Sequence, residues 1–265
     1  MDDPYIWPPT LRLEAIAREI ADEWGLELGP RFALSRFAYA APLGEHVLKI
    51  APSEDDQADL EPDALRFWDG AGAVRILRHD PSRRALLLER VEPGYDASRV
   101  DEGEGIGALL DVGRQLWKPV QDPRFRSAHA AVERSLQTLG AAHPFGDVAR
   151  SIFRSLTPSE QVLLHGDLHH HNLLRGPNGW LAVDPKPLVG EREFDVTAFL
   201  WNPLGQRPTL ERTEARIAAF AAAGLDEARL RAWAIVRGTV WDLPFDPSDA
   251  ASSRAFAVVR QLLER

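Results

Sequence analysis

Residues 162–184 of the chain read VLLHGDLHHHNLLRGPNGWLAVD. A polar stretch that ends at Asn172 lies between two apolar runs, and the turn-forming cluster 175–179 separates the second run from a third. This pattern predicts a hairpin of short strands with a polar loop at its base. Asp167, Asn172 and Asp184 are then expected to converge at one end of the hairpin.

These residue types suit phosphoryl transfer. The reaction needs a carboxylate that orients or deprotonates the attacking hydroxyl, and oxygen ligands that hold Mg²⁺ on nucleotide phosphates. Asp167 followed five positions later by Asn172 matches the kinase pattern H-R-D-x-x-x-x-N, with Gly166 in place of the arginine. Asp184, at the end of the next predicted strand, falls where a second metal-binding aspartate belongs.

The motif H-G-D-x-x-x-x-N, followed by an aspartate after an apolar strand, resembles the aminoglycoside phosphotransferases, small-molecule kinases with a protein-kinase-like fold. Segment 184–195, DPKPLVGEREFD, followed by Asn202-Pro203, more narrowly resembles the streptomycin 6-phosphotransferase and hydroxyurea phosphotransferase branch. The resemblance implies an α+β, two-lobed fold. Residues 1–92 would form a small nucleotide-binding lobe with an antiparallel sheet, and residues 93–265 a mostly helical catalytic and acceptor-binding lobe.

The resemblance also implies cofactors and residue roles. ATP would be the phosphoryl donor, and Mg²⁺ would be held by Asn172 and Asp184. Asp167 would be the catalytic base. His165 would support the catalytic loop, and Asp195 would brace the same loop through its backbone amides.

Four histidines, at positions 165, 169, 170 and 171, raise the alternative of a transition-metal site. Three consecutive side chains of a strand cannot all face one ion. The chain also has no cysteine and no H-E-x-x-H pattern. We therefore do not expect a metal centre of this kind.

The first lobe has a helical pattern over 11–24 and two predicted strands, 32–39 and 46–50. Lys49, in the sequence VLKI, resembles the phosphate-binding lysine of the kinase motif V-A-I-K. Glu61 is the candidate glutamate that would pair with it. Pro62 disfavours a helix that continues across it, so we expect a helix to begin near Pro62 and leave the ion pair open.

The loop that would cover the phosphates, 35–44, has no G-x-G-x-x-G pattern, so only Ser35 or backbone amides remain as candidate phosphate contacts. A Gly-rich cluster at 103–107 follows no clear strand and carries acidic residues, and no P-loop motif is present. A second hairpin is predicted from strands 73–78 and 85–91. Its end resembles an inter-lobe hinge, whose backbone at Glu89, Arg90 and Val91 would bind adenine.

From residue 101 the chain is predicted to be largely helical, over 104–118, 126–142, 145–155, 209–223, 226–241 and 248–264, with a break at Pro244–Pro247. The C-terminal helices of small-molecule kinases form the acceptor pocket, which makes four residues candidate acceptor contacts: Trp201, Asn202, Trp241 and Asp242. Aromatic rings and carboxylates suit a cationic sugar. Lys186 could neutralise phosphate charge or be an ordinary surface lysine, and the sequence leaves this open.

The 265 residues carry a net charge of −9 and no cysteine, with no apolar run of the roughly 20 residues that span a bilayer. The first residues lack the basic and apolar regions of a signal peptide. We expect a cytoplasmic enzyme without nucleic-acid or membrane partners and with a cationic small-molecule acceptor. A monomer and a homodimer both remain open.

The sequence thus predicts ATP-dependent phosphorylation of a small-molecule hydroxyl, with an aminoglycoside such as streptomycin as the leading acceptor. Hydroxyurea or an unrelated metabolite remains an alternative, because the resemblance is carried by ATP-site residues. A non-catalytic nucleotide-binding regulator would not need Asp167. A protein kinase is disfavoured because the Ala-Pro-Glu segment is missing.

Overall fold

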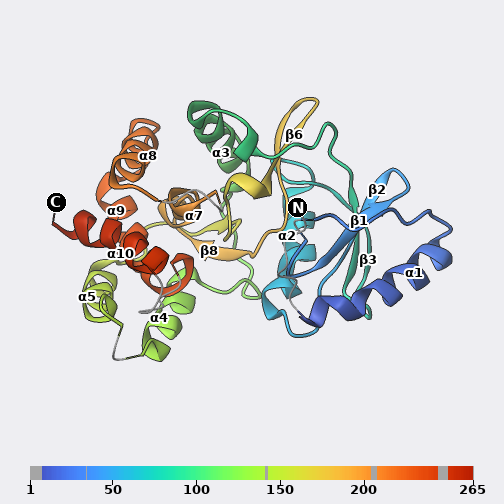
Figure 1. The fold of residues 1–265 in the computed structure, drawn as a ribbon, viewed down its shortest axis with the longest axis horizontal. Coiled ribbons are helices and arrows are strands. Elements are labelled where there is room, and N and C mark those ends of the chain that lie inside the picture. Colours follow the sequence, from blue (N-terminus) through green and yellow to red (C-terminus); the bar gives the residue numbers. More distant parts are fainter. Residues whose placement is uncertain (1–7, 34, 141–142, 204–207, 244–249, 265) are drawn as a thin grey trace.

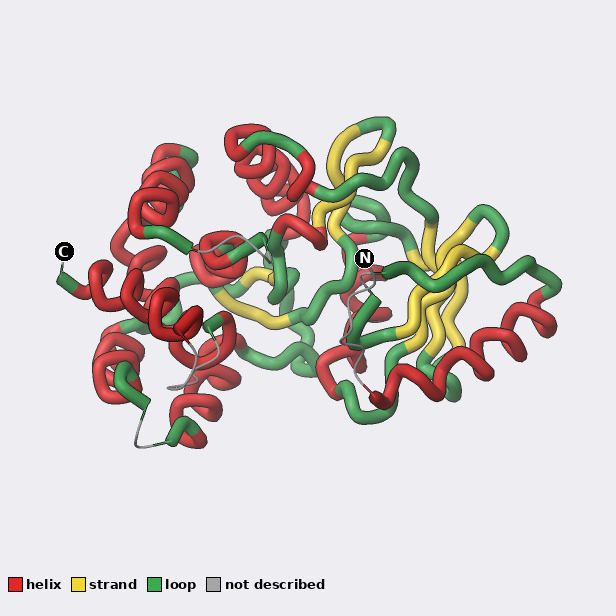
Figure 2. Tube along the Cα trace, viewed as in Figure 1, coloured by secondary structure: helices red, strands yellow, loops and turns green. Residues whose placement is uncertain are grey.

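The computed structural model describes residues 8–33, 35–140, 143–203, 208–243 and 250–264, which form two lobes (Figure 1). The smaller lobe holds a four-stranded antiparallel sheet, and the larger lobe holds most of the helices (Figure 2). The α+β, two-lobed architecture expected from the sequence is therefore confirmed.

In the small lobe, a long helix lies along one face of the sheet (Figure 1). Ile20 of the helix and Leu43 and Leu48 of the sheet are fully buried between them. The strand order is β1-β2-β4-β3. The elements are η1 (Pro8–Arg12), α1 (Leu13–Trp24), β1 (Tyr39–Leu43), β2 (His46–Ile50), β3 (Ile76–Asp80) and β4 (Ala85–Glu89).

The strand predicted over 32–39 is wrong in position, because β1 covers Tyr39–Leu43. The hairpin turns at Gly44, whose φ of +59° favours glycine, so that Leu43 pairs with His46. Pro42 consequently lies inside β1. Proline is tolerated there because β1 is at the edge of the sheet.

Helix α2 (Glu61–Trp68) follows a short 3₁₀ helix, η2 (Asp56–Leu60), and packs against the other face of the sheet. It begins at Glu61 with Pro62 in its first turn, where the missing N–H of proline costs nothing. Trp68 is almost fully buried near the end of α2. The position of Pro62 in the first turn confirms the predicted start of the helix.

The connection between the lobes runs from the end of β4 through residues 90–96 into η3 (Ala97–Arg99) and α3 (Glu102–Leu116). It lies against β6 (Leu173–Gly176), because Arg175 donates to the carbonyl of Tyr95 and accepts from the amide of Gly94. The lobes are therefore joined beside the hairpin that the sequence predicts within residues 162–184.

Two small antiparallel strand pairs follow in the large lobe. β5 (Val162–Leu164) pairs with β8 (Leu188–Gly190), and β6 pairs with β7 (Gly179–Ala182). The β6–β7 hairpin is the one predicted from residues 162–184. The polar stretch 165–172 leaves β5 and enters β6, so the loop is anchored at both ends.

Most helices of the large lobe lie on the side of these strands that faces away from the small lobe (Figure 1). They are α4 (Ala128–Thr138), α5 (Gly146–Ser155), α6 (Arg192–Asp195), α7 (Thr197–Trp201), α8 (Leu210–Ala222), α9 (Glu227–Arg237), the π-helical turn η5 (Gly238–Asp242) and α10 (Ala250–Leu263). The helix predicted over 126–142 is shorter than expected, and the predicted break at Pro244–Pro247 lies outside the described residues. None of the described helices combines the length and the apolar character that crossing a membrane requires.

Candidate active site

Asp195 holds the loop that leaves β5. Its two carboxylate oxygens accept from the backbone amides of His165 at 3.0 Å and Gly166 at 2.8 Å, and from the indole of Trp117 at 2.9 Å. The Asp195 side chain is completely buried, so these donors replace the water it loses. Asp195 thus makes the backbone contacts that the resemblance implied.

His165 supports the same loop from inside. Its side chain is fully buried beside Trp68, and Nε2 lies 2.9 Å from the carbonyl oxygen of Val183. Burial lowers the pKa of the ring, although Asp195 and Asp167 oppose the shift. A neutral imidazole therefore ties the catalytic loop to the strand that leads to Asp184.

Asp167 faces three groups that can carry or share a proton. Lys186 Nζ is 3.3 Å from Oδ2, His169 Nε2 is 3.7 Å from Oδ1, and an Arg237 nitrogen is 3.9 Å from Oδ1. Burial alone would raise the pKa of Asp167, but these three neighbours lower it below the usual value. The carboxylate is therefore ionised at neutral pH.

Asn172 and Asp184 lie next to this group. The amide nitrogen of Asn172 donates to the carbonyl of Asp167 at 2.9 Å, and Val183 N donates to the carbonyl of Asn172. Asp184 follows with a φ of +59°, a left-handed conformation that is costly for a non-glycine residue and that clusters at functional sites. Asp167, Asn172 and Asp184 thus converge as the sequence predicted.

Lys49 connects this centre to the small lobe. Its Nζ is 2.5 Å from Asp184 Oδ1 and 2.5 Å from Glu61 Oε2, so the pair that the sequence left open is present. Burial works against the Lys49 charge, but the two carboxylates raise its pKa above the ordinary value. Burial raises the pKa of Glu61 to about 7, with Lys49 opposing the shift.

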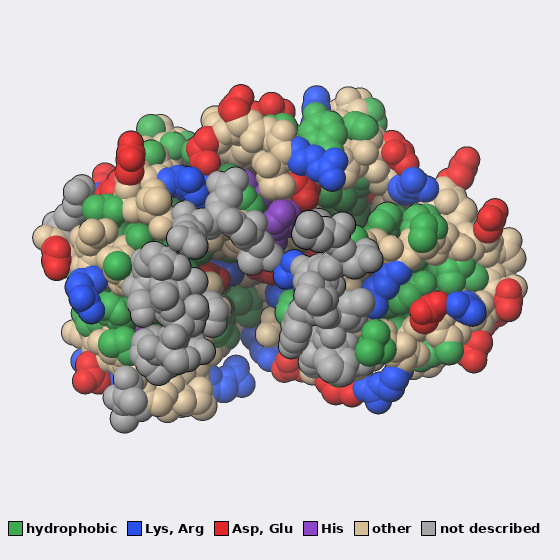
Figure 3. All heavy atoms as spheres, in the orientation of Figure 1, with side chains coloured by type: hydrophobic (Ala, Val, Ile, Leu, Met, Phe, Trp, Pro, Cys, Tyr) green, Lys and Arg blue, Asp and Glu red, His purple; other side chains and the backbone are tan. Residues whose placement is uncertain are grey.

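The neighbouring histidines point in different directions. His171 Nδ1 is 2.9 Å from Asp96 Oδ2, the His170 ring stacks on Phe199 at 3.6 Å between centroids, and His169 faces Asp167. Figure 3 shows histidine side chains in the notch between the lobes. Within the described part of the chain, no cluster of three or more His, Cys, Asp or Glu residues is arranged to hold a metal ion.

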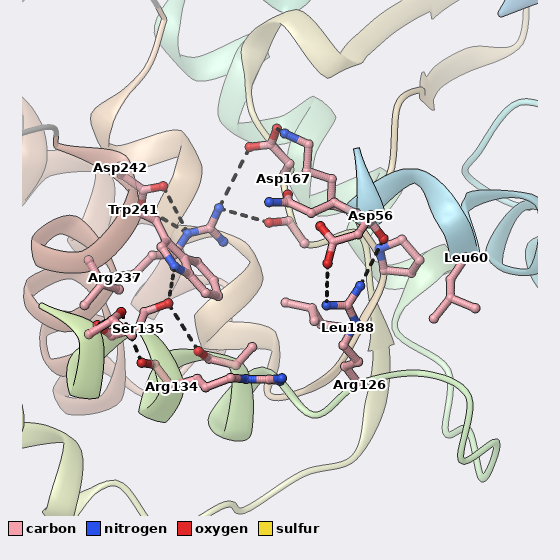
Figure 4. A pocket seen from close by; sticks show the side chains of 17 residues that line it. Asp56, Leu60, Arg126, Arg134, Ser135, Asp167, Leu188, Arg237, Trp241 and Asp242 are labelled. Carbon is pink, nitrogen blue, oxygen red and sulfur yellow. Dashed lines mark hydrogen bonds and ion pairs between the residues drawn. The ribbon is translucent and has the colours of Figure 1, made fainter. Parts of the chain in front are cut away.

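A cavity of about 660 Å³ opens beside Asp167 (Figure 4). Residues 56–60, helix α4, segment 186–188 and the end of α9 with η5 contribute its walls. Its charged lining residues are Asp56, Arg126, Arg134, Asp167, Lys186, Arg237 and Asp242. The base candidate therefore stands at the edge of a space large enough for a small molecule.

Two of the acceptor candidates, Trp241 and Asp242, line this cavity. Trp241 is 38% exposed, and its indole donates to Ser135 Oγ at 2.9 Å. Burial raises the pKa of Asp242 to about 6, although Arg237 Nε lies 3.1 Å away and opposes the shift. An aromatic side chain and a titratable carboxylate thus line the cavity.

The other two acceptor candidates are not among the residues that line the cavity, and we correct that expectation. Trp201 is part of the hydrophobic core, with 7% of its surface exposed. Asn202 donates to the carbonyl of Ala198 and accepts from Arg216, so it closes the end of α7. A tryptophan at a helix end reads the same in sequence whether it faces the core or a pocket.

The structure gives Ser35 a local role. Its hydroxyl donates to the carbonyl of Ala38 at 2.6 Å, so a phosphate contact would require that bond to break. Sequence reasoning misses Arg237, although this residue donates to the carbonyl of Gly166 at 3.0 Å and pairs with Asp242. No local pattern marks it, because it reaches the loop from a helix 71 positions away.

Between a sheet lobe and a helical lobe, the structure holds a lysine–glutamate pair, an H-G-D-x-x-x-x-N loop and a following aspartate. Together these features define a phosphotransferase of the protein-kinase-like fold. Residues 41–242 match the model of the aminoglycoside/hydroxyurea antibiotic resistance kinase family. The chain belongs to this family and is a small-molecule kinase. The branch that the sequence indicated is confirmed.

Similar proteins agree with this assignment. A hydroxyurea phosphotransferase from Kitasatospora aureofaciens is 32% identical over 93% of this chain and 78% of its own length. A streptomycin 3''-kinase from Klebsiella pneumoniae is 35% identical over 71% of this chain and 75% of its own length. The fold matches a solved aminoglycoside phosphotransferase, APH(4)-Ia, in complex with AMP-PNP and hygromycin B, with a TM-score of 0.65 and 18% identity. The match covers 93% of this chain and 98% of that structure's chain.

Proposed function

We propose that the enzyme transfers the γ-phosphoryl group of ATP to a hydroxyl of a small molecule bound in the cavity beside Asp167, with streptomycin as the leading acceptor. One observation carries the proposal. Asp167 borders the 660 Å³ cavity, and the side chain of Asn172 donates to the carbonyl of Asp167. Beside them, Asp184 contacts Lys49 of the small lobe. A donor site and an acceptor site therefore meet at one carboxylate.

Each residue has a role in this reaction. Asp167 orients the acceptor hydroxyl and takes its proton while the bond from oxygen to phosphorus forms. Lys49, held by Glu61, steadies the α- and β-phosphates. His165 and Asp195 hold the loop at the required position, so that catalysis comes mainly from positioning and charge neutralisation.

The donor set near Asp167 fits Mg²⁺. The side-chain nitrogen of Asn172 donates to the protein, which leaves the side-chain oxygen, Oδ1, for a cation, and Lys49 holds only one oxygen of Asp184. Proteins usually bind Mg²⁺ through one or two carboxylates together with substrate phosphates, not through a cage of protein ligands. When bound, the ion would neutralise phosphate charge during transfer.

Adenine is proposed to bind the backbone of Glu89, Arg90 and Val91, at the junction of the lobes, with the domain boundary near residue 92. Nucleotide binding to this chain is supported by the fold it shares with the AMP-PNP complex of APH(4)-Ia. We further propose that the enzyme works in the cytoplasm, as a monomer or a homodimer. A net charge of −9 disfavours nucleic-acid partners.

The acceptor is proposed to be cationic. A partly exposed indole ring, that of Trp241, and the carboxylate of Asp242 line the cavity, and such groups bind ammonium and guanidinium ions. Hydroxyurea is the second candidate, because a relative that is 32% identical carries its name. Hydroxyurea is neutral and small, so it would not need these two contacts.

The test is an incubation of purified enzyme with Mg-ATP and one acceptor at a time: streptomycin, other aminoglycosides, hydroxyurea or none. Mass spectrometry then follows the gain of one phosphoryl group. We expect streptomycin to gain phosphate with wild-type enzyme and not with Asp167→Asn. If only hydroxyurea is modified, the second candidate replaces the first. If no acceptor is modified, the proposal for these acceptors is wrong.

A further inference from the structure

The chain uses lysine very sparingly. Of its 31 basic residues Lys and Arg, only three are lysines: Lys49, Lys118 and Lys186. Lys118 is exposed on the surface after α3, whereas Lys49 and Lys186 both contact carboxylates of the active site. A protein that otherwise relies on arginine thus keeps two ammonium groups at its reaction centre. The proposed function assigns a role to only one of them.

The ammonium of Lys186 lies between the site and the cavity. Nζ is 3.3 Å from Asp167 Oδ2, and Lys186 also lines the cavity wall. About a third of the side chain is exposed, and Lys186 borders the cavity where the acceptor is proposed to bind. Burial opposes the charge, but Asp167 and then Asp184 raise the pKa of Lys186 above its ordinary value, and the amine is charged at neutral pH.

The backbone of Lys186 is fixed against the catalytic loop. Its amide donates to the carbonyl of His165 at 2.8 Å, and prolines 185 and 187 restrict the chain on both sides. Gly166 permits this approach: a Cβ there would lie 1.9 Å from the carbonyl oxygen of Lys186. A solvated surface lysine does not require such a constraint.

We infer that Lys186 is a further catalytic residue of the phosphoryl transfer, and this rests on the proposed function. Its ammonium, 3.3 Å from Asp167 Oδ2, orients the carboxylate before the reaction and stabilises negative charge on the phosphoryl group during it. A bond forms between the acceptor oxygen and the γ-phosphorus. The bond from that phosphorus to the β,γ-bridging oxygen breaks, and its electron pair leaves on ADP. The hydroxyl proton passes to Asp167.

A compact ammonium suits this position better than a guanidinium. Lysine concentrates its charge in one small group, whereas arginine spreads it over a planar fork that binds carboxylates with two parallel hydrogen bonds. A fork that gripped both Asp167 oxygens would block the proton acceptor. This explains a lysine here in a chain rich in arginine, and predicts that Lys186→Arg restores the charge but only part of the rate.

The experiment compares Lys186→Met, Lys186→Arg and the control Lys118→Met with wild type, using the acceptor identified above. We expect Lys186→Met to lower kcat by about 10² to 10³, the cost of losing one preorganised donor, with the KM for ATP changed less than about threefold. Lys118→Met should behave as wild type.

A second readout does not need an acceptor. In ¹³C-aspartate-labelled enzyme, the carboxyl resonance missing from Asp167→Asn identifies Asp167, and its chemical shift at neutral pH should change in Lys186→Met but not in Lys118→Met. A kcat within about threefold of wild type, or an unchanged Asp167 resonance, overturns the inference. If wild type phosphorylates nothing while the resonance shifts, the proposed function fails and the Lys186–Asp167 contact stands.

Discussion

At the scale of single residues, the site depends on carboxylates whose surroundings give them different tasks. Asp195 is completely buried and binds three N–H donors, Asp184 shares Lys49 with Glu61, and Asp167 faces the cavity. The same side chain therefore serves as a structural brace, a candidate metal ligand and a candidate base. What differs is which partners satisfy it, and these partners are visible only in the fold.

Removing the brace should damage both stability and rate. Asp195→Ala leaves the amides of His165 and Gly166 and the indole of Trp117 without their acceptor. At about 1–3 kcal/mol for each buried unsatisfied group, with partial relaxation, we expect the free energy of unfolding to fall by about 3 kcal/mol, measured by urea denaturation. Trp117→Phe removes one donor and keeps the brace, so it should cost less. Equal stability of Asp195→Ala and wild type would contradict this role.

The pH dependence of acceptor binding should follow Asp242. Its pKa is raised to about 6, so the carboxylate is charged above pH 6 and neutral below it. For a cationic acceptor, KM should therefore rise as the pH falls from 7.5 to 5, while the KM for ATP follows a different curve. Steady-state kinetics of Asp242→Asn should give an acceptor KM without that rise. An identical pH profile in the variant would exclude Asp242 from acceptor binding.

At the scale of elements, two separate segments are in contact: the catalytic loop after β5 and the stiff Pro185–Pro187 segment before β8. Gly166, with a φ of +82°, is the position that allows this contact. Any side chain would be strained by the φ and would meet a backbone carbonyl that cannot yield. The geometry of Asp167 and Lys186 thus depends on a missing Cβ.

Gly166→Ala should therefore lower kcat by at least about 10²-fold, because a displacement near 1 Å has that effect on catalytic geometry. Gly107→Ala is the matched control. Gly107 lies in helix α3, where an added Cβ would meet nothing within 4 Å, so it should tolerate alanine or gain stability. Rates and thermal melting of the two variants check this. Near-normal rates in Gly166→Ala would mean that the loop relaxes freely.

Elements marked by local signals could be predicted from the sequence. The β6–β7 hairpin, the start of α2 near Pro62 and the H-G-D loop follow from turn residues, proline chemistry and spacing. The position of β1 could not be predicted, because the local sequence does not show which residues pair with β2, and the pairing places Tyr39–Leu43 opposite His46–Ile50. Arg237 and Trp201 could not be assigned, because what a helix face contacts is decided by packing between distant segments.

At the scale of the whole molecule, the two lobes meet where Lys49 of the sheet lobe contacts Asp184 of the helical lobe. Nucleotide with Mg²⁺ should link the lobes further. At 100 times the dissociation constant, a ligand that binds only the folded state adds about 2.7 kcal/mol of stability. We expect melting temperature to rise with AMP-PNP and Mg²⁺, and most of the rise to disappear with EDTA or in Asp184→Asn. An EDTA-insensitive rise would argue against a metal held at Asp184.

Asp167 is proposed to act at the junction of a donor site and an acceptor cavity. The most direct measurement is a single turnover of γ-labelled ATP with excess enzyme and the identified acceptor, comparing wild type with Asp167→Asn, alongside calorimetric titration of nucleotide. If Asp167 is the base, the transfer rate should be lower by about 10² to 10⁴ in the variant, with nucleotide affinity unchanged. A rate within about threefold of wild type at equal nucleotide affinity would contradict it.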